Sequence, residues 1–287
     1  GIPSEIVHLS TNPRVLIRRG GQPRPAARCV VYWMQRAMRI FDNPALDVAI
    51  EAGNLLGLPV AVFFSVIPNY PNANLRHYHF MAQGLRDVEA DAAERGVGFV
   101  VRRPPDNSLG TFLEEVEAAM LIGDENPCRE PERWRIVLAR RLKLPFWTVD
   151  ADVVVPSAVF GRSFHLLHHF RPHLNRALPE FLVPHLNLKP FHPWKSRKLF
   201  AHFSPHNDIT AGFKSLDRSV GPVDTFAGGA HEANRRLALF LVRGLAHYNR
   251  VRNLPECDGT SRLSPYLHFD HIIPLTIALA AQQTATS

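Results

Sequence analysis

The chain has 287 residues, of which 46% are hydrophobic and 21% charged, and its formal net charge is +7. This composition excludes a disordered, collagen-like or coiled-coil chain, and the length suits one large domain or two smaller ones. The three cysteines are odd in number and far apart, which excludes a disulfide framework and fits a cytoplasmic protein. The positive charge fits a nucleic-acid partner and, equally, a soluble protein that is basic for no functional reason.

Strand and helix patterns alternate through the first half of the chain. Short apolar, β-branched or aromatic runs predict five strands, at residues 29–34, 59–66, 97–102, 119–123 and 145–149. Apolar residues at helical spacing predict the helices between them, at residues 44–56, 75–95, 108–118 and 131–142. Continuous apolar strands separated by helices indicate a parallel sheet that is covered on both faces. We therefore predict an α/β fold with a doubly wound parallel five-stranded sheet over residues 28–156.

The pattern changes in the second half. Residues 157–205 are rich in proline, histidine and aromatic residues and have no sustained period, which predicts a long linker. Residues 230–251 then have helical spacing, and residues 260–281 predict one or two further helices. We expect residues 206–287 to be all-helical. The longest apolar runs, near 60–66 and 274–281, are too short to cross a bilayer, so we expect no membrane partner.

The α/β part lacks the sequence motifs of several common enzyme sites. No GxxxxGK[ST] is present, no GxGxxG follows the first strand, and the turn at residues 35–39 has no glycine for a close phosphate approach. An ordinary NAD-binding domain is therefore excluded. GxSxG and HExxH are also absent.

A stretch of closely spaced histidines could place imidazoles on one helix face: His165, His168, His169 and His173. No cysteine or carboxylate lies within the stretch to complete a metal site, so we favour exposed or interdomain histidines and assign no metal.

Two charged features also have structural explanations. The helix at 131–142 carries several arginines that could bind DNA, but its acidic start and basic end complement the helix dipole, which favours a solvated face. Asp150 and Asp152 follow the fifth strand, at the edge where α/β proteins bind ligands. A turn or capping role explains them equally well, and they stay unassigned.

The most informative segment is residues 248–269, YNRVRNLPECDGTSRLSPYLHF. Tyr248 and Arg252 lie one turn apart at the end of a predicted helix. Residues 260–265 place hydroxyl groups just before another helix, with Pro265 at its start. Hydroxyl and N–H groups at a helix N-terminus can bind phosphate, although a simple N-cap explains the segment if it is taken alone.

These residues together resemble the DNA photolyase and cryptochrome family. The matching positions are Tyr248, Arg252, Asn253, Pro255, Gly259, Thr260, Ser261, Leu263, Ser264 and Leu267. The first half is similar to the class II cyclobutane pyrimidine dimer photolyases. That match lies at residues 31–34 (VYWM), 42–46 (DNPAL), 145–156 and 178–182 (LPEFL). The resemblance covers nearly the whole chain from about residue 29.

The resemblance implies a Rossmann-like antenna domain followed by a helical FAD-binding domain. It implies FAD contacts at Tyr248, Thr260, Ser261, Leu263 and Ser264. It makes Arg252 a contact to damaged double-stranded DNA. The implied activity is that of a deoxyribodipyrimidine photolyase, a carbon–carbon lyase that repairs cyclobutane pyrimidine dimers by electron transfer from excited, reduced FAD.

A deazaflavin or a folate is the implied antenna chromophore of the α/β domain. We expect a monomer, and we assign no catalytic residue within the chain. The alternative is a cryptochrome-like or antenna-only protein that binds a chromophore without repairing DNA.

Two features depart from the family pattern. Asp270 stands where the family has glycine after SPYLHF, and aspartate adopts a positive φ less readily, so the resemblance does not fix the local turn. The chain also stops at Ser287, and all four tryptophans precede the FAD motif, so none matches the family's electron relay. We therefore expect a photolyase truncated within its FAD-binding domain.

Overall fold

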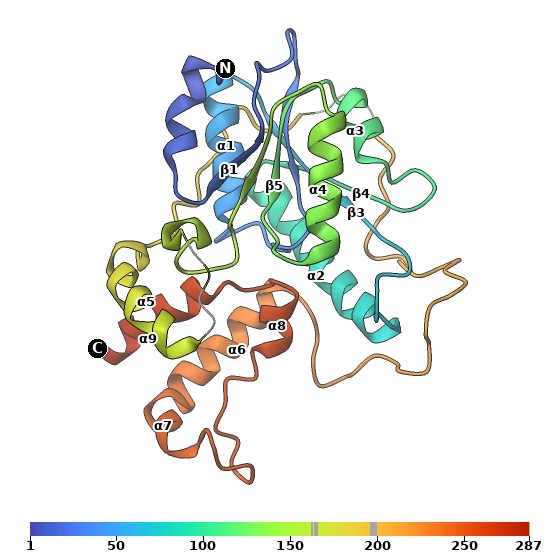
Figure 1. Cartoon of the computed structure of the whole chain (residues 1–287). Coiled ribbons are helices and arrows are strands. Elements are labelled where there is room, and N and C mark those ends of the chain that lie inside the picture. The colour runs from blue at the N-terminus through green and yellow to red at the C-terminus, as the bar shows by residue number, and fades with distance from the viewer. Residues whose placement is uncertain (162, 164–165, 196–199, 287) are drawn as a thin grey trace.

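The computed structural model describes residues 1–161, 163, 166–195 and 200–286. A layered α/β part lies above a group of helices (Figure 1). The strands of the α/β part are β1 (Val15–Arg19), β2 (Cys29–Trp33), β3 (Val60–Ser65), β4 (Gly98–Arg102), β5 (Ala118–Asp124) and β6 (Phe146–Val149). They form one six-stranded sheet in the order β1-β6-β5-β2-β3-β4.

The five predicted strands are present and pair in parallel, which confirms the doubly wound α/β fold. The sixth, β1, is not predicted by the sequence pattern and pairs antiparallel with β6 at the edge of the sheet. Leu16 and Ile17 of β1 are exposed, so the strand lacks the continuous burial of the inner strands. Side chains hold it in place, because Arg18 forms ion pairs with Glu125 at 2.5 Å and with Glu132 at 2.7 Å.

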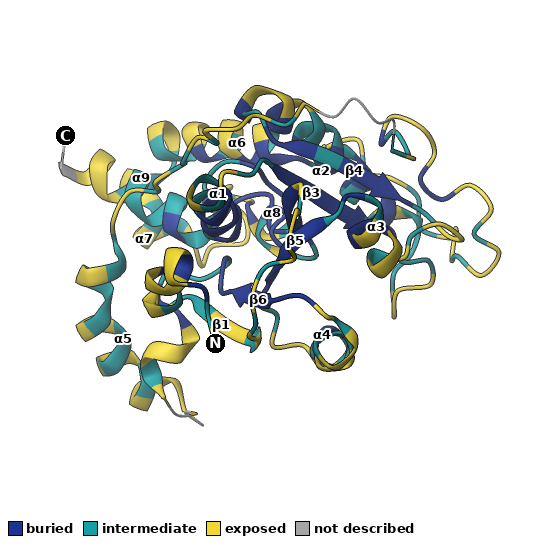
Figure 2. Cartoon of the chain, turned by 90° about the horizontal axis from the view of Figure 1, so that it is seen from above, coloured by how far each residue is buried: buried dark blue, intermediate teal, exposed yellow. Residues whose placement is uncertain are grey.

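Helices cover both faces of the sheet (Figures 1 and 2). The helices on one face are α1 (Pro44–Leu56) and α2 (Leu75–Arg95), and those on the other are α3 (Leu109–Glu115) and α4 (Arg129–Arg141). The short 3-10 helix η1 (Ser4–Thr11) packs beside α1. Side chains of β2 alternate between the two apolar layers: Tyr32 packs with the α1 side, and Val31 and Trp33 with the α3 side.

Local signals set most of these helix ends. The Asn43 side chain accepts the N–H groups of Ala45 and Leu46 and so caps α1. α2 ends at Gly96, which has a left-handed backbone with φ +82°. Ser108 caps α3 by accepting the N–H of Thr111.

The region predicted as a linker contains two helices. They are the 3-10 helix η2 (Ser157–Phe160) and the longer α5 (Leu167–Phe181). α5 holds Pro172 and Pro179 inside its span, and prolines of this kind normally argue against a helix in a sequence pattern. None of its residues is buried, so the helix projects from the rest of the molecule.

The chain after α5 runs along the α/β part as an ordered strap, which we define as residues 187–195 and 200–204. The N–H of Leu188 donates to Asp47 at 2.9 Å, and its carbonyl accepts Arg95 Nε at 3.0 Å. Farther along, the N–H of Phe203 donates to the carbonyl of Val101 on β4 at 2.8 Å. The strap therefore covers the edge of β4 that would otherwise have free backbone groups.

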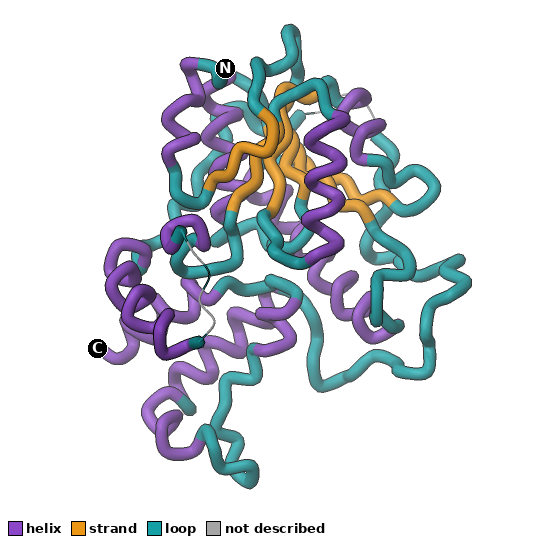
Figure 3. Tube along the Cα trace, viewed as in Figure 1, coloured by secondary structure: helices purple, strands orange, loops and turns teal. Residues whose placement is uncertain are grey.

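Residues 205–229 contain no helix, so the part expected to be all-helical from residue 206 becomes helical only at α6. From there the described chain consists of helices joined by loops (Figure 3). The helices are α6 (Ala230–Arg243), η3 (Leu245–His247), α7 (Tyr248–Val251), α8 (Ser264–His268) and α9 (Pro274–Thr286). The helix predicted at 230–251 is thus interrupted at Gly244. Among the helices that the structure describes, none is long and apolar enough to cross a membrane.

The start of α6 is fixed to α2 by polar contacts. The N–H of Gly228 donates to Gln83 at 2.7 Å, and the N–H of His231 donates to Asp87 at 3.0 Å. The His231 ring also contacts Asp91 at 2.8 Å. These three acceptors on α2 are spaced four residues apart and face the same way, so they form a row along which α6 begins.

The strap yields a packing prediction at Gly98. A Cβ atom added to Gly98 would lie 2.7 Å from the ring of Trp194 in the strap. Gly98→Ala should therefore lower the free energy of unfolding by about 1–3 kcal/mol, because the ring must move. Chemical denaturation measures the change. The matched control is Gly110→Ala in α3. The added methyl group has space there, so this variant should not destabilise the protein. Equal stabilities of the two variants would contradict the packing.

The contact of His231 with α2 yields a pH prediction. The hydrogen bond to Asp91 raises the pKa of His231 above its usual value. The protonated ring therefore adds stability that is complete below about pH 6.5 and is lost as pH rises through the raised pKa. Melting temperatures of the wild type and His231→Gln should differ more at about pH 6 than at about pH 8.5. A difference that does not change with pH would show that the charge of His231 has no part in the contact.

Candidate functional site

Tyr248 begins α7, directly after the interruption of the helix. Its ring lies edge-on to Phe240, with the ring centroids 5.6 Å apart. The guanidinium of Arg252 lies over the same ring, 5.6 Å from its centroid. This cation–π contact confirms that Tyr248 and Arg252 are neighbours one turn apart, and the side chain of Arg252 is exposed.

Gly259 brings the second half of the motif against this helix. The residue is buried, and an added Cβ atom would lie 2.5 Å from Cγ2 of Val251 and 2.8 Å from its carbonyl oxygen. A residue with any side chain could not approach the backbone of α7 so closely. Residues 258–264 therefore lie on the end of the helix that carries Tyr248.

The hydroxyl residues of this loop lie at the surface. Thr260 and Ser264 are exposed and Ser261 is half-buried, and within the described chain their hydroxyls have no hydrogen-bond partner. Leu263, in contrast, is 2% exposed and packs in an apolar cluster with Tyr266. The leucine thus anchors the loop and leaves the hydroxyls on both sides of it available to a ligand.

α8 is a short helix. It has five residues, and its capping residue Leu263 makes no side-chain hydrogen bond. A single turn aligns few peptide dipoles, so the end of this helix is not an anion site by itself. The candidate site consists instead of the loop hydroxyls and Tyr248.

A second group of polar residues lies at the carboxyl edge of the sheet, where the strand order changes direction between β2 and β5. Asp124 occupies this position, and the Tyr32 hydroxyl donates to its Oδ1 at 2.6 Å. Its Oδ2 accepts three consecutive backbone N–H groups at 2.8–3.0 Å, those of Gln35, Arg36 and Ala37. Converging N–H groups of this kind bind phosphate in other proteins. Here the carboxylate of Asp124 accepts these N–H groups in place of a phosphate, which agrees with the absence of a glycine-rich loop from the sequence.

Charged side chains surround Asp124. We call them the carboxyl-edge cluster: Arg14, Arg36, Arg39, Asp124, Asp150, Asp152 and Asp270. Arg36 contacts Asp152 at 2.6 Å and Asp270 at 3.3 Å. Burial raises the pKa of Asp152 to about 6 and that of Asp270 to about 8. The sequence analysis leaves Asp152 unassigned, and the structure shows that it forms an ion pair with Arg36.

Asp150 has the turn role that the sequence analysis weighs for it. Its Oδ2 accepts both the N–H and the hydroxyl of Ser157 at 2.8 Å, at the start of η2. The side chain therefore orders the exit of the chain from β6.

Arg39 is the most completely enclosed arginine of the cluster, with 2% of its surface exposed. It donates hydrogen bonds to three backbone carbonyls, those of Asp42 at 2.9 Å, Ala151 at 2.5 Å and Asp270 at 3.0 Å. These carbonyls belong to segments before α1, after β6 and after α8. The sequence analysis assigns no role to Arg36 or Arg39, and their position after the first predicted strand is the signal that could have found them.

Asp270 keeps the backbone conformation that a glycine would adopt. Its φ is +53°, in the left-handed region. The turn therefore uses a conformation that glycine adopts at lower cost, and it carries a carboxyl side chain that glycine lacks.

The histidine stretch does not form a metal site in the described part of the chain. His165 lies outside the described residues, and His168 and His169 are exposed on α5. No three His, Cys, Asp or Glu side chains among the described residues are placed to hold a metal ion.

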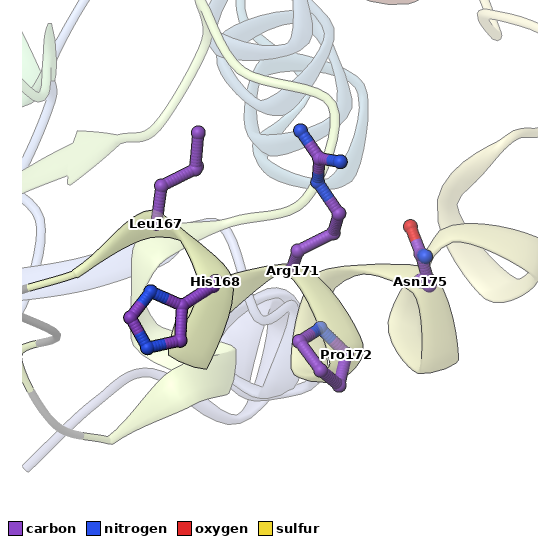
Figure 4. A pocket seen from close by; sticks show the side chains of 5 residues that line it. All are labelled: Leu167, His168, Arg171, Pro172 and Asn175. Atoms are coloured by element: carbon purple, nitrogen blue, oxygen red, sulfur yellow. The ribbon is translucent and has the colours of Figure 1, made fainter.

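A hollow on α5 is equally unsuited to a ligand, because every described residue that lines it belongs to this one helix. Figure 4 shows Leu167 and Arg171 on one side of the helix and His168 and Pro172 on the other. The side chains do not converge on a common space.

A cavity of about 270 Å³ lies between α2, α6 and the start of α9. Two of its three lining carboxylates, Asp42 and Asp91, accept hydrogen bonds within the chain, and the third is Glu94. Asp42 accepts the Thr276 hydroxyl at 2.8 Å, and Asp91 accepts a hydrogen bond from His231. We assign no ligand to it.

The basic helix α4 presents Arg133, Arg140 and Arg141 to solvent. Arg135 differs, because it is fully buried and forms an ion pair with Glu132 at 2.5 Å. One arginine of the predicted solvated face is therefore a structural residue.

Comparison with known proteins gives consistent matches. The sequence model of the family described as DNA photolyase matches residues 30–194. A deoxyribodipyrimidine photo-lyase of Methanothermobacter thermautotrophicus is 34% identical over 276 residues, which cover 94% of this chain and 60% of the relative. One of Arabidopsis thaliana is 28% identical and is matched over 97% of this chain and 59% of its own length. The chain thus spans about 60% of the length of these relatives.

The fold is also found among solved structures. A bacterial class III photolyase from Agrobacterium tumefaciens superposes with a TM-score of 0.63 at 17% identity. The match covers 92% of this chain and 55% of that protein.

The close approach at Gly259 can be tested directly. Gly259→Ala should push residues 258–264 away from α7 and destabilise the loop by about 1–3 kcal/mol. Hydrogen exchange of the amides at 258–264 measures this, and we expect faster exchange there. Gly221→Ala, which has no atom near the added methyl, is the control and should leave the loop unchanged. Unchanged protection in Gly259→Ala would disprove the contact.

Proposed function

The chain belongs to the DNA photolyase family, and we propose that it serves the light-driven repair of cyclobutane pyrimidine dimers in DNA by electron transfer from reduced FAD. The relatives named deoxyribodipyrimidine photo-lyase support the reaction class, that of a carbon–carbon lyase. FAD supplies the excited-state electron when it is bound and reduced. The role of the chain is to hold the cofactor and the damaged DNA.

The contact between Gly259 and Val251 is the observation that carries this proposal. Tyr248 and residues 260–264 are the two halves of the sequence motif that resembles the family's FAD-phosphate site. The missing side chain at Gly259 lets both halves share one surface. Without this approach the motif would be two separate segments.

The residues of this surface fit a diphosphate group. The hydroxyls of Tyr248, Thr260, Ser261 and Ser264 are donors. Leu263 would contribute its backbone only, because its side chain is buried. Neutral donors without a partner in the chain favour binding of an anion, since no internal bond has to be broken first.

We assign the DNA contact to Arg252. Its guanidinium is exposed and lies over the ring of Tyr248, so it is held beside the proposed flavin surface. A cation at this place attracts the phosphates of a DNA strand, and the net charge of +7 favours the same partner.

Several finer expectations stay predictions: membership of class II, a deazaflavin or folate antenna, a monomeric state, a cytoplasmic location and the division at residues 156 and 205. The cryptochrome-like alternative differs from the proposal in one measurable respect, because it binds a chromophore and leaves dimers intact.

The test is a repair assay. The product of the complete reading frame that encodes this chain is loaded with FAD, reduced and mixed with an oligonucleotide that holds one thymine dimer. We expect blue light to restore the thymine absorbance, and darkness to leave the dimer intact. Arg252→Ala should bind the damaged oligonucleotide about tenfold more weakly. Arg129→Ala, an exposed arginine on α4, is the matched control and should bind normally.

Two results would contradict the proposal. A protein that binds FAD and repairs nothing under light would be the cryptochrome-like alternative. A protein that does not bind FAD would remove the cofactor assignment together with the repair function.

A further inference from the structure

The left-handed backbone at Asp270 carries an energetic cost that a glycine would avoid. An L-residue in this region is less stable by roughly 1 kcal/mol, although aspartate tolerates it better than most residues. The side chain is 3% exposed and directed into the carboxyl-edge cluster. Its Oδ1 lies 3.8 Å from Arg39 and its Oδ2 3.3 Å from Arg36. The chain thus keeps a buried carboxyl group at a position suited to glycine.

The charges of the cluster do not balance when every group is ionised. Three guanidinium groups, of Arg14, Arg36 and Arg39, stand against four carboxyl groups. One bound proton makes the two signs equal. A buried cluster with an unpaired negative charge is unfavourable, so the proton has a physical reason to stay.

Among the four carboxyl groups of the cluster, Asp270 is the one that binds this proton most favourably. Asp124 accepts four hydrogen bonds and Asp150 accepts two, which favour their ionised forms. Asp152 forms the shortest ion pair with Arg36. Asp270 has the weakest contacts, since its Oδ2 has no hydrogen-bond partner, and burial raises its pKa to about 8.

The groups that face Asp270 come from several elements. Arg36 and Arg39 follow β2, Asp124 ends β5 and Asp152 follows β6. Its neighbour His271 is buried, with a pKa lowered by burial to about 3, so the ring is neutral and does not compensate a charge on Asp270.

The position of Asp270 links this cluster to the proposed flavin site. Asp270 lies two residues after the end of α8, and its N–H donates to the carbonyl of Leu267 at 3.3 Å. α8 itself begins at Ser264, directly after Leu263 of the candidate loop. Arg39 holds the carbonyl of Asp270 at 3.0 Å, so the cluster fixes one end of the segment whose other end presents the hydroxyls.

We infer that Asp270 is a positioning residue for the flavin-phosphate loop, which it holds on the α/β part as a neutral, protonated carboxyl group between Arg36 and Arg39. This inference rests on the proposed function. Loss of the proton places a fourth negative charge in the buried cluster and loosens the segment. Flavin affinity of the protein then depends on the pH through a carboxyl group that lies outside the candidate loop.

The experiment measures the affinity for FAD by fluorescence quenching between about pH 6.5 and pH 9.5. We expect the affinity of the wild type to fall with a midpoint near pH 8. Asp270→Asn keeps the neutral shape and tolerates the left-handed backbone, so it should bind like the wild type at pH 6.5 and show no alkaline fall. Asp270→Gly relieves the backbone and removes the side chain, so it should bind about tenfold more weakly than the wild type at pH 6.5 and show no alkaline fall.

Stability supplies a second measurement, which does not need flavin. An acid with a raised pKa stabilises the fold fully below its unfolded pKa of about 4, and this stability is lost as pH rises through about 8. The melting temperature of the wild type relative to Asp270→Asn should therefore decline over this range. Asp106→Asn, at an exposed loop carboxylate, is the control and should follow the wild type throughout.

The outcomes separate the two proposals. If the wild type binds FAD and Asp270→Asn shows the same alkaline fall, another group titrates and the inference is wrong. If Asp270→Gly binds as tightly as the wild type at pH 6.5, the side chain positions nothing. If the wild type does not bind FAD at any pH, the proposed function fails and this inference fails with it.

Discussion

The three hydrogen bonds that Arg39 donates to backbone carbonyls hold together parts of the chain that are far apart in sequence. Its acceptors lie at residues 42, 151 and 270, so one guanidinium joins the entry to α1, the exit from β6 and the turn after α8. A buried arginine is stable only when its donors are satisfied, and here backbone oxygens satisfy them. The position of the helical part on the sheet depends on this arrangement.

At the carboxyl edge of the sheet, charged side chains of the chain contact one another where other α/β proteins bind a ligand. These contacts connect the α/β part to the helical part. In a doubly wound sheet the crevice at the change of strand order is where a nucleotide commonly binds. Asp124 fills that crevice and accepts the N–H groups that could hold a phosphate. The neighbouring Arg36 then forms ion pairs with the buried Asp152 and Asp270 rather than with a ligand. The surface proposed for the flavin lies instead on the helical part.

Two further contacts hold segments of the chain against the α/β part. The strap covers the edge of β4 and packs the Trp194 ring onto Gly98. The row of acceptors on α2 receives the start of α6, with His231 between Asp87 and Asp91. Both contacts use close approach or paired charges, so both are sensitive to small changes in side-chain size or pH.

The candidate site was predictable as a set of residues, although its assembly was not. Tyr248, Arg252 and the hydroxyl residues are adjacent or one turn apart in sequence, and their pattern resembles a known family. The close approach of Gly259 to Val251 could not be derived in this way, because the loop conformation decides it. The sequence left the conformation of Asp270 open, because the buried cluster that contacts its side chain is not visible in the sequence around residue 270.

The sequence by itself determined the inner strands, the helices α1 to α4 and the family, since burial on both faces, helical spacing and caps such as Asn43 and Gly96 are local properties. It could not determine β1, whose mixed exposure resembles that of a loop, or α5, whose prolines argue against a helix. The tertiary structure alone decided the carboxyl-edge cluster. Its members come from segments as far apart as residues 14 and 270, and such contacts exist only once the sheet has brought the ends of its strands together.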